Sequence, residues 1–274
     1  MRNYFNQESL TGVIGYPLKQ SLSPLLHNYW IKKNEIQSYY KAFEIKNLKH
    51  INKAIRALNI KGLNVTIPYK KKIIKYLDEV DTTANKLEAV NTIKNINGIL
   101  KGYNTDVKGF NKGLDKIQQF DKNRPIVVLG AGGAASSIIY SLVKGKFKDI
   151  RVMNRTLTKA KKFEDKYRNV KSAKWLSYNI INESGLIINT TSLGMIGYPK
   201  LPIKLDNTYN QLKVYDIVYN PLKTQLIKDA KKQNLEYVDG LTMFLGQAEE
   251  SFRIWYNKKP KIDKTLLQLI KKKI

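Results

Sequence analysis

The sequence contains no cysteine and only two histidines among its 274 residues. Without cysteine the chain can form no disulfide, no thiolate nucleophile and no cysteine-ligated zinc or iron–sulfur site. Two histidines, His27 and His50, cannot supply a multi-histidine metal site, so we expect no bound metal. No apolar run approaches the ~20 residues of a membrane helix, and the first residues lack the apolar stretch of a signal peptide. We therefore expect a soluble, cytoplasmic protein with no membrane partner.

Acidic residues are also scarce, since 22 Asp and Glu stand against 49 Lys and Arg, giving a formal net charge of +27. Such a charge would suit nucleic-acid binding. The lysines are spread along the chain, however, their densest runs (70–72 and 271–273) are short, and no zinc finger, RNP motif or basic heptad region is present. A solvated lysine surface is the simpler interpretation, and we expect no nucleic-acid partner. The positive field would also attract a phosphorylated dinucleotide and a carboxylate substrate.

The first hundred residues alternate short apolar runs with amphipathic segments, which predicts an α/β sheet. Ser23 is predicted to cap a helix that has Pro24 at its first position. Asn97-Gly98 predicts the primed turn of a β-hairpin. The remaining predicted elements of this region are strands at 11–16, 39–45, 63–67, 90–96 and 99–103 and a helix at 48–58.

The second half opens with a helix predicted from Asp106 to Gln119 and continues with a βαβ unit. Its parts are a buried strand at 126–129, a glycine-rich loop, a helix at 134–144 and a strand at 150–153. Further strands are predicted at 186–189, 214–218 and 235–238, and helices at 242–256 and 264–272. This is the pattern of a doubly wound dinucleotide-binding domain.

The glycine-rich loop follows an apolar strand and precedes a helix. Gly130 permits the tight turn, Gly132 lets the backbone approach a pyrophosphate, and Ala135 allows close packing of helix against strand. The helix N-terminus offers free N–H groups to the phosphates. A purely structural turn is the alternative. The residues predicted to bind the cofactor here are Gly130, Ala131, Gly132, Gly133 and Ala134.

The second strand of this unit ends at Met153-Asn-Arg-Thr156 without an acidic residue. An NAD-specific site usually has an acid there for the ribose hydroxyls. Arg155 can instead bind a 2′-phosphate or stack on adenine, with Asn154, Thr156, Thr158 and Lys159 nearby. The segment therefore favours NADP as cofactor, although a solvated basic turn remains the alternative.

Two short motifs lie before the glycine-rich loop: Asn64-Val-Thr-Ile-Pro-Tyr-Lys70 and Gly102-Tyr-Asn-Thr-Asp106. Each motif places one ionisable residue among small polar ones. Reduction of a ketone by a nicotinamide also requires a proton donor. We hypothesise that Lys70 exchanges this proton and that Asp106, at a helix start where the dipole favours negative charge, orients it. From the residues alone, a surface lysine and a helix cap remain the simpler interpretation.

The other polar candidates suit a small anion that carries several hydroxyls. Ser21 and Ser23 can donate to a carboxylate, since no arginine is evident for that purpose. The predicted hydroxyl-binding residues are Asn64, Thr66 and Asn91, and Gln247, on a later helix, is predicted to close the substrate site. Ser23 also suits an N-cap, and Asn91 a turn. Loops at the carboxyl ends of parallel strands add the substrate candidate Tyr219 and the cofactor candidates Thr190, Val218 and Gly240. Met243, close after Gly240, is a further cofactor candidate.

These motifs stand in a fixed order: Ser21-Leu-Ser-Pro24, the Lys70 motif, Ala89-Val-Asn-Thr92, the Asp106 motif, the glycine loop, Asn154-Arg-Thr156 and Gly240-Leu-Thr-Met243 with Gln247. Together they resemble the shikimate dehydrogenase family over residues 11–247. The resemblance implies a two-domain α/β fold. An N-terminal substrate domain (1–105, with returning helices 242–274) accompanies a Rossmann NADP-binding domain (106–241), with the active site in the cleft between them.

The resemblance also implies a reaction, the reversible reduction of 3-dehydroshikimate to shikimate by NADPH. It gives Lys70 and Asp106 the proton-handling roles, and it places Thr190, Val218, Tyr219 and Gly240 beside the nicotinamide and the substrate. The expected partner is a small-molecule substrate, and the protein is expected to be a monomer or homodimer. A quinate/shikimate dehydrogenase of dual specificity and a non-catalytic nucleotide- or nucleic-acid-binding protein are the alternatives.

Overall fold

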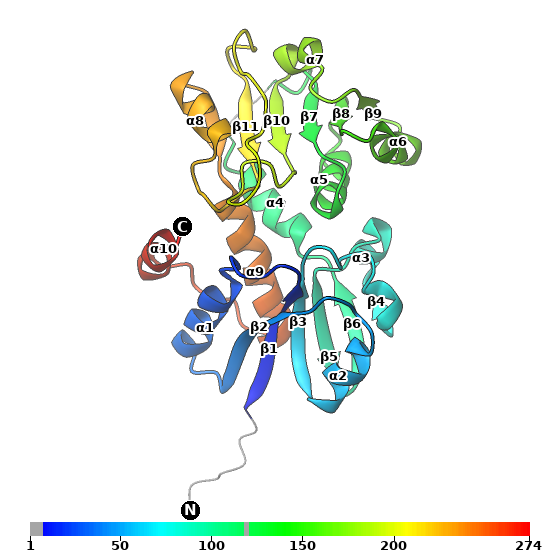
Figure 1. The fold of residues 1–274 in the computed structure, drawn as a ribbon, viewed down its shortest axis with the longest axis vertical. Helices are drawn as coiled ribbons and strands as arrows, with labels where there is room; N and C mark the ends of the chain where they lie inside the picture. The colour runs from blue at the N-terminus through cyan, green and yellow to red at the C-terminus, as the bar shows by residue number, and fades with distance from the viewer. Residues whose placement is uncertain (1–7, 118–120) are drawn as a thin grey trace, which may run out of the picture. The chain divides into compact units, whose positions relative to one another are not determined.

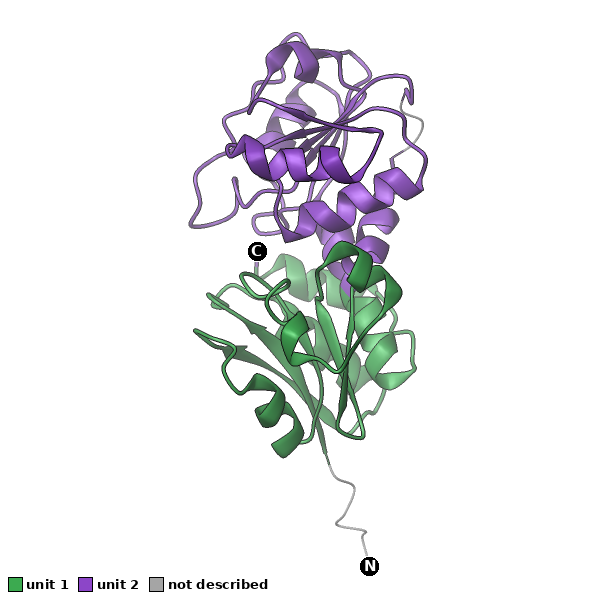
Figure 2. Cartoon of the chain, turned by 90° about the vertical axis from the view of Figure 1, so that its right-hand side faces the viewer, with its two compact units in different colours: residues 1–105, 248–273 green, residues 106–247, 274 purple. Residues whose placement is uncertain are grey.

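A computed structural model describes residues 8–117 and 121–274. The chain divides into two compact units, unit 1 from residues 1–105 and 248–273 and unit 2 from residues 106–247 and 274 (Figure 2). Each unit contains one six-stranded sheet, so the predicted α/β class is confirmed. Among the described residues, no helix has both the length and the apolar character that a membrane crossing requires.

The sheet of unit 1 is mixed, with the strand order β2-β1-β3-β5-β6-β4 (Figure 1). Its strands are β1 (Ser9–Gly15), β2 (Ser38–Glu44), β3 (Ile60–Val65), β4 (Glu79–Val80), β5 (Thr92–Ile96) and β6 (Ile99–Tyr103). β1 pairs in parallel with β2 and β3, whereas β5 runs antiparallel to both β3 and β6. The carboxyl ends of β1, β3 and β6 and the amino end of β5 therefore lie at one edge of the sheet.

The helical segments of unit 1 are α1 (Ser23–Lys33), α2 (Ile51–Ala57), the 3-10 turn η1 (Ile74–Tyr76), α3 (Thr82–Leu87) and α10 (Lys264–Lys271). Two predicted details are wrong. Ser23 is the first residue of α1 and not its cap, because Leu22 already has helical geometry (φ −86°, ψ −2°). α2 begins at Ile51 instead of residue 48, because His50 has a left-handed backbone (φ 63°).

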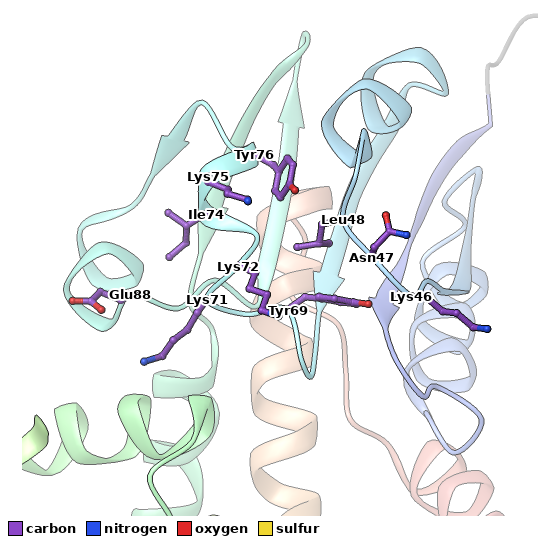
Figure 3. Close-up of a pocket in the computed structure, with 10 residues that line it drawn as sticks. All are labelled: Lys46, Asn47, Leu48, Tyr69, Lys71, Lys72, Ile74, Lys75, Tyr76 and Glu88. Carbon is purple, nitrogen blue, oxygen red and sulfur yellow. The ribbon is translucent and has the colours of Figure 1, made fainter. Parts of the chain in front are cut away.

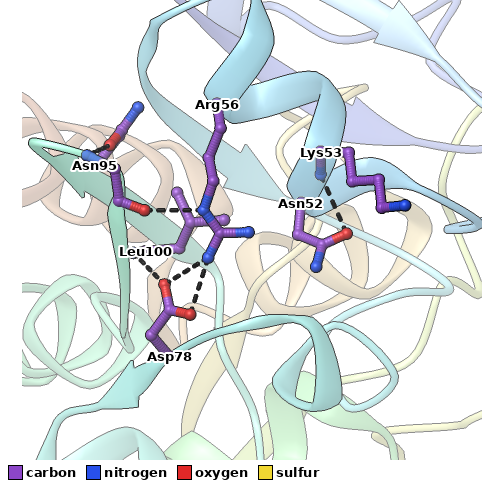
Figure 4. Close-up of polar contacts among 7 residues, drawn as sticks. Asn52, Lys53, Arg56, Asp78, Asn95 and Leu100 are labelled. Carbon is purple, nitrogen blue, oxygen red and sulfur yellow. Dashed lines mark hydrogen bonds and ion pairs between the residues drawn. The ribbon is translucent and has the colours of Figure 1, made fainter.

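The predicted hairpin between β5 and β6 is confirmed, and its turn residues Asn97 and Gly98 both have positive φ, 51° and 90°. Arg56 of α2 donates from Nε to the Gly98 carbonyl (2.8 Å) and from Nη2 to the Asp78 carboxylate (2.7 Å; Figure 4). The Leu100 amide also donates to Asp78 at 2.6 Å. The pKa of Asp78 is held below its ordinary value first by this amide and then by Arg56. These contacts join the hairpin to the segment before β4.

The sheet of unit 2 is entirely parallel, with the strand order β12-β11-β10-β7-β8-β9. Its strands are β7 (Ile126–Leu129), β8 (Ile150–Met153), β9 (Val170–Ala173), β10 (Leu186–Asn189), β11 (Lys213–Asp216) and β12 (Glu236–Val238). The order reverses between β7 and β10, which is the topological switch point of a doubly wound sheet. The predicted strands in this region are confirmed, except that β11 ends two residues early; β9 was not predicted.

The helices of unit 2 are α4 (Asp106–Leu114), α5 (Gly133–Lys144), α6 (Leu157–Lys166), α7 (Tyr178–Glu183) and α8 (Gln225–Lys232), and α9 (Gly240–Tyr256) carries the chain into residues assigned to unit 1. α4 ends at Leu114 and not at the predicted Gln119, which lies outside the described residues. Along β7 the side chains of Ile126 and Val128 enter one apolar core, and those of Val127 and Leu129 enter another. The sheet is thus buried on both faces, as a parallel sheet requires.

Candidate functional site

Every cofactor candidate except Met243 lies in a loop that follows a strand of the parallel sheet or at the start of the helix after it. The glycine loop follows β7, the Arg155 segment follows β8, Thr190 follows β10, Val218 follows β11 and Gly240 follows β12. Because the strands are parallel, these five segments share the carboxyl edge of the sheet. Ligands of open α/β sheets bind at this edge, at the switch point that β7 and β10 form here.

The glycine loop has the backbone geometry that a phosphate site needs. Gly130 has φ +109°, and a Cβ there would lie 2.7 Å from Thr190 Oγ1, so only glycine fits. At Gly132, the residue before α5, a Cβ would meet no protein atom within 4 Å. No side chain caps α5, whose first N–H groups adjoin this open space. The loop therefore fits the pyrophosphate of a dinucleotide.

The segment after β8 carries the predicted phosphate-binding residue Arg155, whose side chain is exposed to solvent. Arg155 and Lys159 are exposed, and α6 begins at Leu157 with Thr156 before it. Asn154 donates its side-chain amide to the Thr156 carbonyl at 2.9 Å, which holds the turn in shape. An exposed guanidinium beside the phosphate loop can reach an adenosine 2′-phosphate, and no acidic side chain stands in this turn.

The loops after β10 and β11 are held by a buried carboxylate whose role the sequence did not reveal. Asp216, fully buried, accepts hydrogen bonds from Asn189 Nδ2 (2.9 Å), Thr224 Oγ1 (2.7 Å) and the Val218 amide (3.0 Å). Asn189 in turn accepts from the Thr191 amide and hydroxyl (3.0 and 2.7 Å). Asp216 thus fixes both loops that carry the candidates Thr190, Val218 and Tyr219.

Burial raises the pKa of Asp216 from its ordinary value of 3.8 to about 6, against the opposing effect of its hydrogen bonds. Because the folded-state pKa lies above the unfolded one, the stabilisation from this group is complete below pH 3.8 and is lost as the pH rises through 6. In the parent protein, this group should lower the free energy of unfolding by about 2 kcal/mol between roughly pH 4 and 6.5. Asp216→Asn is expected to abolish that decrease. Urea unfolding at both pH values measures this slope.

The matched control for that prediction is Asp206→Asn, which alters an exposed carboxylate in the same unit. It should leave the pH dependence of the unfolding free energy as in the parent protein. An unchanged slope in Asp216→Asn would show that Asp216 does not titrate in this range.

The start of α9 supplies two more candidates, Gly240 and Met243, and packs against a third, Tyr219. A Cβ at Gly240 would lie 2.3 Å from the Ile217 carbonyl oxygen, so the helix start requires glycine for close approach to the β11 loop. Tyr219 stacks on Phe244 with ring centroids 4.4 Å apart, and burial raises the pKa of Tyr219 to about 12. Tyr219 is therefore a neutral hydroxyl at physiological pH. Met243 packs in the apolar core of unit 2.

In unit 1 the predicted substrate residues gather at one edge of the mixed sheet. Ser21 and Ser23 follow β1, Thr66 and Lys70 follow β3, and Asn91 precedes β5. The Thr66 amide donates to the Ile14 carbonyl (3.0 Å), and the Lys70 carbonyl accepts from the Val90 amide (2.9 Å). Topology, not sequence distance, thus brings these polar side chains to the same edge.

Behind this edge lies a buried network of amides and hydroxyls. Asn64 Oδ1 accepts from Tyr40 Oη (2.8 Å), and Asn64 Nδ2 lies within hydrogen-bond distance of Ser251 Oγ (3.0 Å) and Thr92 Oγ1 (3.2 Å). Ser251 Oγ and Thr92 Oγ1 are themselves 2.8 Å apart. Asn91 joins the network through Oδ1, which accepts from the Thr105 amide at 2.8 Å. Asn64 is 7% exposed, and both ends of its amide have protein partners.

Removal of the Ser251 hydroxyl tests this network. Ser251→Ala would leave a buried amide N–H and a threonine hydroxyl with one partner fewer, and the expected loss of unfolding free energy is about 1–3 kcal/mol. Denaturant unfolding measures it. Ser9→Ala, which removes only a long, exposed contact (3.4 Å), should cost less than about 0.5 kcal/mol. Equal effects of the two variants would contradict a special role for the network.

Two further predicted residues, Asp106 and Gln247, are the first and last residues of the main segment of unit 2. Asp106 is the first residue of α4, as predicted, and is 4% exposed. Gln247 is half-buried on α9 and donates to the Phe244 carbonyl (3.0 Å). His27 is not a candidate acid or base here: burial lowers its pKa to about 3, and its ring stacks on Tyr40 at 4.3 Å.

Comparison with known proteins matches both halves of the chain to domains of the same family of enzymes. Residues 13–93 match the shikimate dehydrogenase substrate-binding domain, and residues 113–196 match the shikimate/quinate 5-dehydrogenase domain. An NADP⁺ shikimate dehydrogenase of Methanosphaera stadtmanae is 40% identical, with 96% of each chain covered. The chain belongs to the shikimate dehydrogenase family.

Solved structures agree with this membership. The shikimate dehydrogenase of Aquifex aeolicus superposes with a TM-score of 0.86 at 38% identity, covering 97% of this chain and 98% of that one. The enzyme of Thermus thermophilus in complex with NADP(H) and shikimate gives 0.85 at 27% identity, covering 96% and 98%. The family resemblance and fold class predicted from the sequence are thus confirmed. The sequence motifs contain the candidates that line the two sheet edges, whereas Asp216, Tyr40 and Ser251 stand in no motif that would reveal them.

Proposed function

We propose that the protein is an NADP-dependent oxidoreductase that reduces 3-dehydroshikimate reversibly to shikimate, a step of aromatic amino-acid biosynthesis. The relatives that cover nearly the whole chain at about 40% identity are NADP⁺ shikimate dehydrogenases. A structural relative has been solved with NADP(H) and shikimate together.

The observation that carries this proposal is the chemistry of two sheet edges. One unit presents a phosphate-accepting loop with the open space at Gly132 and an exposed Arg155. The other presents hydroxyls, an amide and the Lys70 amine, all suited to a small polyhydroxy acid. A nucleic-acid-binding protein would not need a phosphate-accepting loop in one unit and a separate group of hydroxyl, amide and amine side chains in the other.

The bound nicotinamide supplies the hydride, and the chain's own residues must supply the proton. We assign Lys70 as the group that gives its proton to the carbonyl oxygen as that oxygen becomes a hydroxyl, and takes it back in the reverse direction. Asp106 accepts a hydrogen bond from the same hydroxyl and orients it. Neither role needs a metal ion or a histidine.

Binding of the substrate is assigned to residues with hydrogen-bond donors on the unit 1 edge and to two residues of unit 2. Ser21 and Ser23 donate to the carboxylate, while Thr66 and Asn91 bind ring hydroxyls. Tyr219 and Gln247 complete the set. We assign Asn64 to positioning, because its amide already has protein partners at both ends. Such paired polar groups would strongly reject an analogue that lacks one hydroxyl.

The direct test is absorbance at about 340 nm, where reduced nicotinamides absorb. The purified protein receives shikimate or quinate, each with NADP⁺ or NAD⁺. Turnover mainly with shikimate and NADP⁺ supports the proposal in full. Comparable turnover of quinate, or comparable use of NAD⁺, supports the dual-specificity alternative that the family's domain name includes. A folded protein inactive with all four pairs contradicts both.

A monomeric or homodimeric state, a cytoplasmic location and the lack of a nucleic-acid partner belong to the same proposal. Both reactants are small, water-soluble molecules, and both predicted sets of contacts lie within a single chain. Light scattering coupled to size-exclusion chromatography measures the oligomeric state directly.

A further inference from the structure

A cavity of about 540 Å³ lies in unit 1, formed by residues other than the predicted site residues. One wall is the segment 46–48 that follows β2, and the other is the segment 69–76 that follows β3 (Figure 3). The full lining consists of Lys46, Asn47, Leu48, Tyr69, Lys71, Lys72, Ile74, Lys75, Tyr76 and Glu88. Nothing in the proposed reaction uses this cavity.

The lining combines strong positive charge with an apolar floor. The lining contains four lysines and one carboxylate, Glu88, so the cavity has a formal charge of +3. All four lysines are exposed, and among the described residues no ion pair involves them. Leu48 and Tyr69 are 5% exposed and form a floor between the cationic rims, where Figure 3 shows the Tyr69 ring extending towards Asn47 and Lys46.

The backbone of the cavity is held in place before any ligand arrives. Tyr69 Oη donates to the Ile45 carbonyl (2.8 Å), which ties one wall to the other. The turn that carries three of the lysines is anchored by Ile73, which is fully buried and whose amide donates to the Tyr69 carbonyl (2.9 Å). On the rim, the Lys75 ammonium lies 5.1 Å from the centre of the Tyr76 ring. Preorganised walls lower the entropic cost of binding.

We propose that this cavity binds a small aryl phosphate, that is, a planar apolar ring that bears one phosphate group. The dianionic phosphate would lie among the ammonium groups of the rim, since several point charges around one phosphate neutralise it better than one does. The ring would cover the apolar floor of Leu48 and Tyr69. This proposal does not depend on the reaction assigned above, because no residue that lines the cavity takes part in it.

Isothermal titration calorimetry at about 0.15 M salt tests the proposal, because non-specific attraction to a highly charged surface is screened at that ionic strength. The probes are phenyl phosphate, inorganic phosphate and phenol. Phenyl phosphate should bind saturably, with one equivalent per chain. Inorganic phosphate lacks the ring and phenol lacks the phosphate, so each of them should bind about tenfold more weakly. Equal binding of inorganic phosphate would show that the apolar floor contributes nothing and would overturn the proposal.

Three double variants locate the binding. Lys71→Gln with Lys72→Gln should weaken phenyl phosphate binding about tenfold. Lys231→Gln with Lys232→Gln, which removes the same charge from the exposed end of α8, should change it less than twofold. Lys46→Gln with Lys75→Gln repeats the test on the rest of the rim. Equal weakening by the cavity and α8 variants, or no saturable binding to the parent protein, overturns the proposal.

Discussion

Lys70→Ala is expected to lower kcat about 1,000-fold, within the range of 10²–10⁴ that positioned acid–base groups typically contribute. Without the amine, the developing alkoxide must take its proton from water, while hydride donor and substrate remain in place. The Michaelis constants should therefore change much less than kcat. Stopped-flow or steady-state absorbance of the reduced cofactor measures both.

Two controls make the result specific for proton transfer. Lys53→Ala removes an exposed lysine of α2 in the same unit and should leave kcat within twofold. Added methylamine should partly restore turnover in Lys70→Ala, because a small amine can occupy the space of the deleted one, and should not affect Lys53→Ala. A folded Lys70→Ala variant that keeps kcat within tenfold of the parent would refute the assignment.

The second large effect concerns the cofactor. Arg155→Ala is expected to reduce kcat/KM for NADPH about 100-fold, since charge-assisted hydrogen bonds to phosphate are worth about 1.5–3 kcal/mol and Arg can make two at once. NADH lacks the 2′-phosphate, so its kcat/KM should change less than threefold. The ratio of the two values, measured with the same substrate, reports the selectivity.

Arg168→Ala is the matched control, because Arg168 is also an exposed arginine of unit 2 but stands outside the loops at the carboxyl edge of the sheet. It should leave the NADPH/NADH ratio unchanged, apart from a small general effect of lost positive charge. If Arg155→Ala gives the same ratio as Arg168→Ala, the 2′-phosphate is bound elsewhere. The lysine at position 159 would then be the next residue to replace.

Part of the high net positive charge is concentrated at one cavity of the structure. Most lysines are exposed and dispersed, as the composition suggested, but four of them surround one cavity with an apolar floor. Charge alone would attract any anion, whereas the buried Leu48 and Tyr69 select for one with an apolar part. The titrations above distinguish a general electrostatic effect from a defined site.

The sequence by itself determined the elements whose signals are local. The Asn97-Gly98 turn, the strand 126–129 and the glycine loop follow from the conformational freedom of glycine and from short apolar runs, and the structure confirms them. Helix boundaries were less accurate: Leu22 and His50 take backbone conformations that side-chain patterns do not reveal. The helices α6, α7 and α8 were not predicted at all.

Only the tertiary structure decided which polar residues form hydrogen bonds with one another. Asn64, Thr92 and Ser251 are separated by up to 187 positions, yet Asn64 Nδ2 and Ser251 Oγ lie 3.0 Å apart because β3, β5 and α9 pack together in unit 1. Asp216 likewise meets Asn189 and Thr224 only because β10 and β11 are neighbours in the sheet. A hydrogen bond depends on distance in space, and strand order, which no local motif encodes, sets that distance.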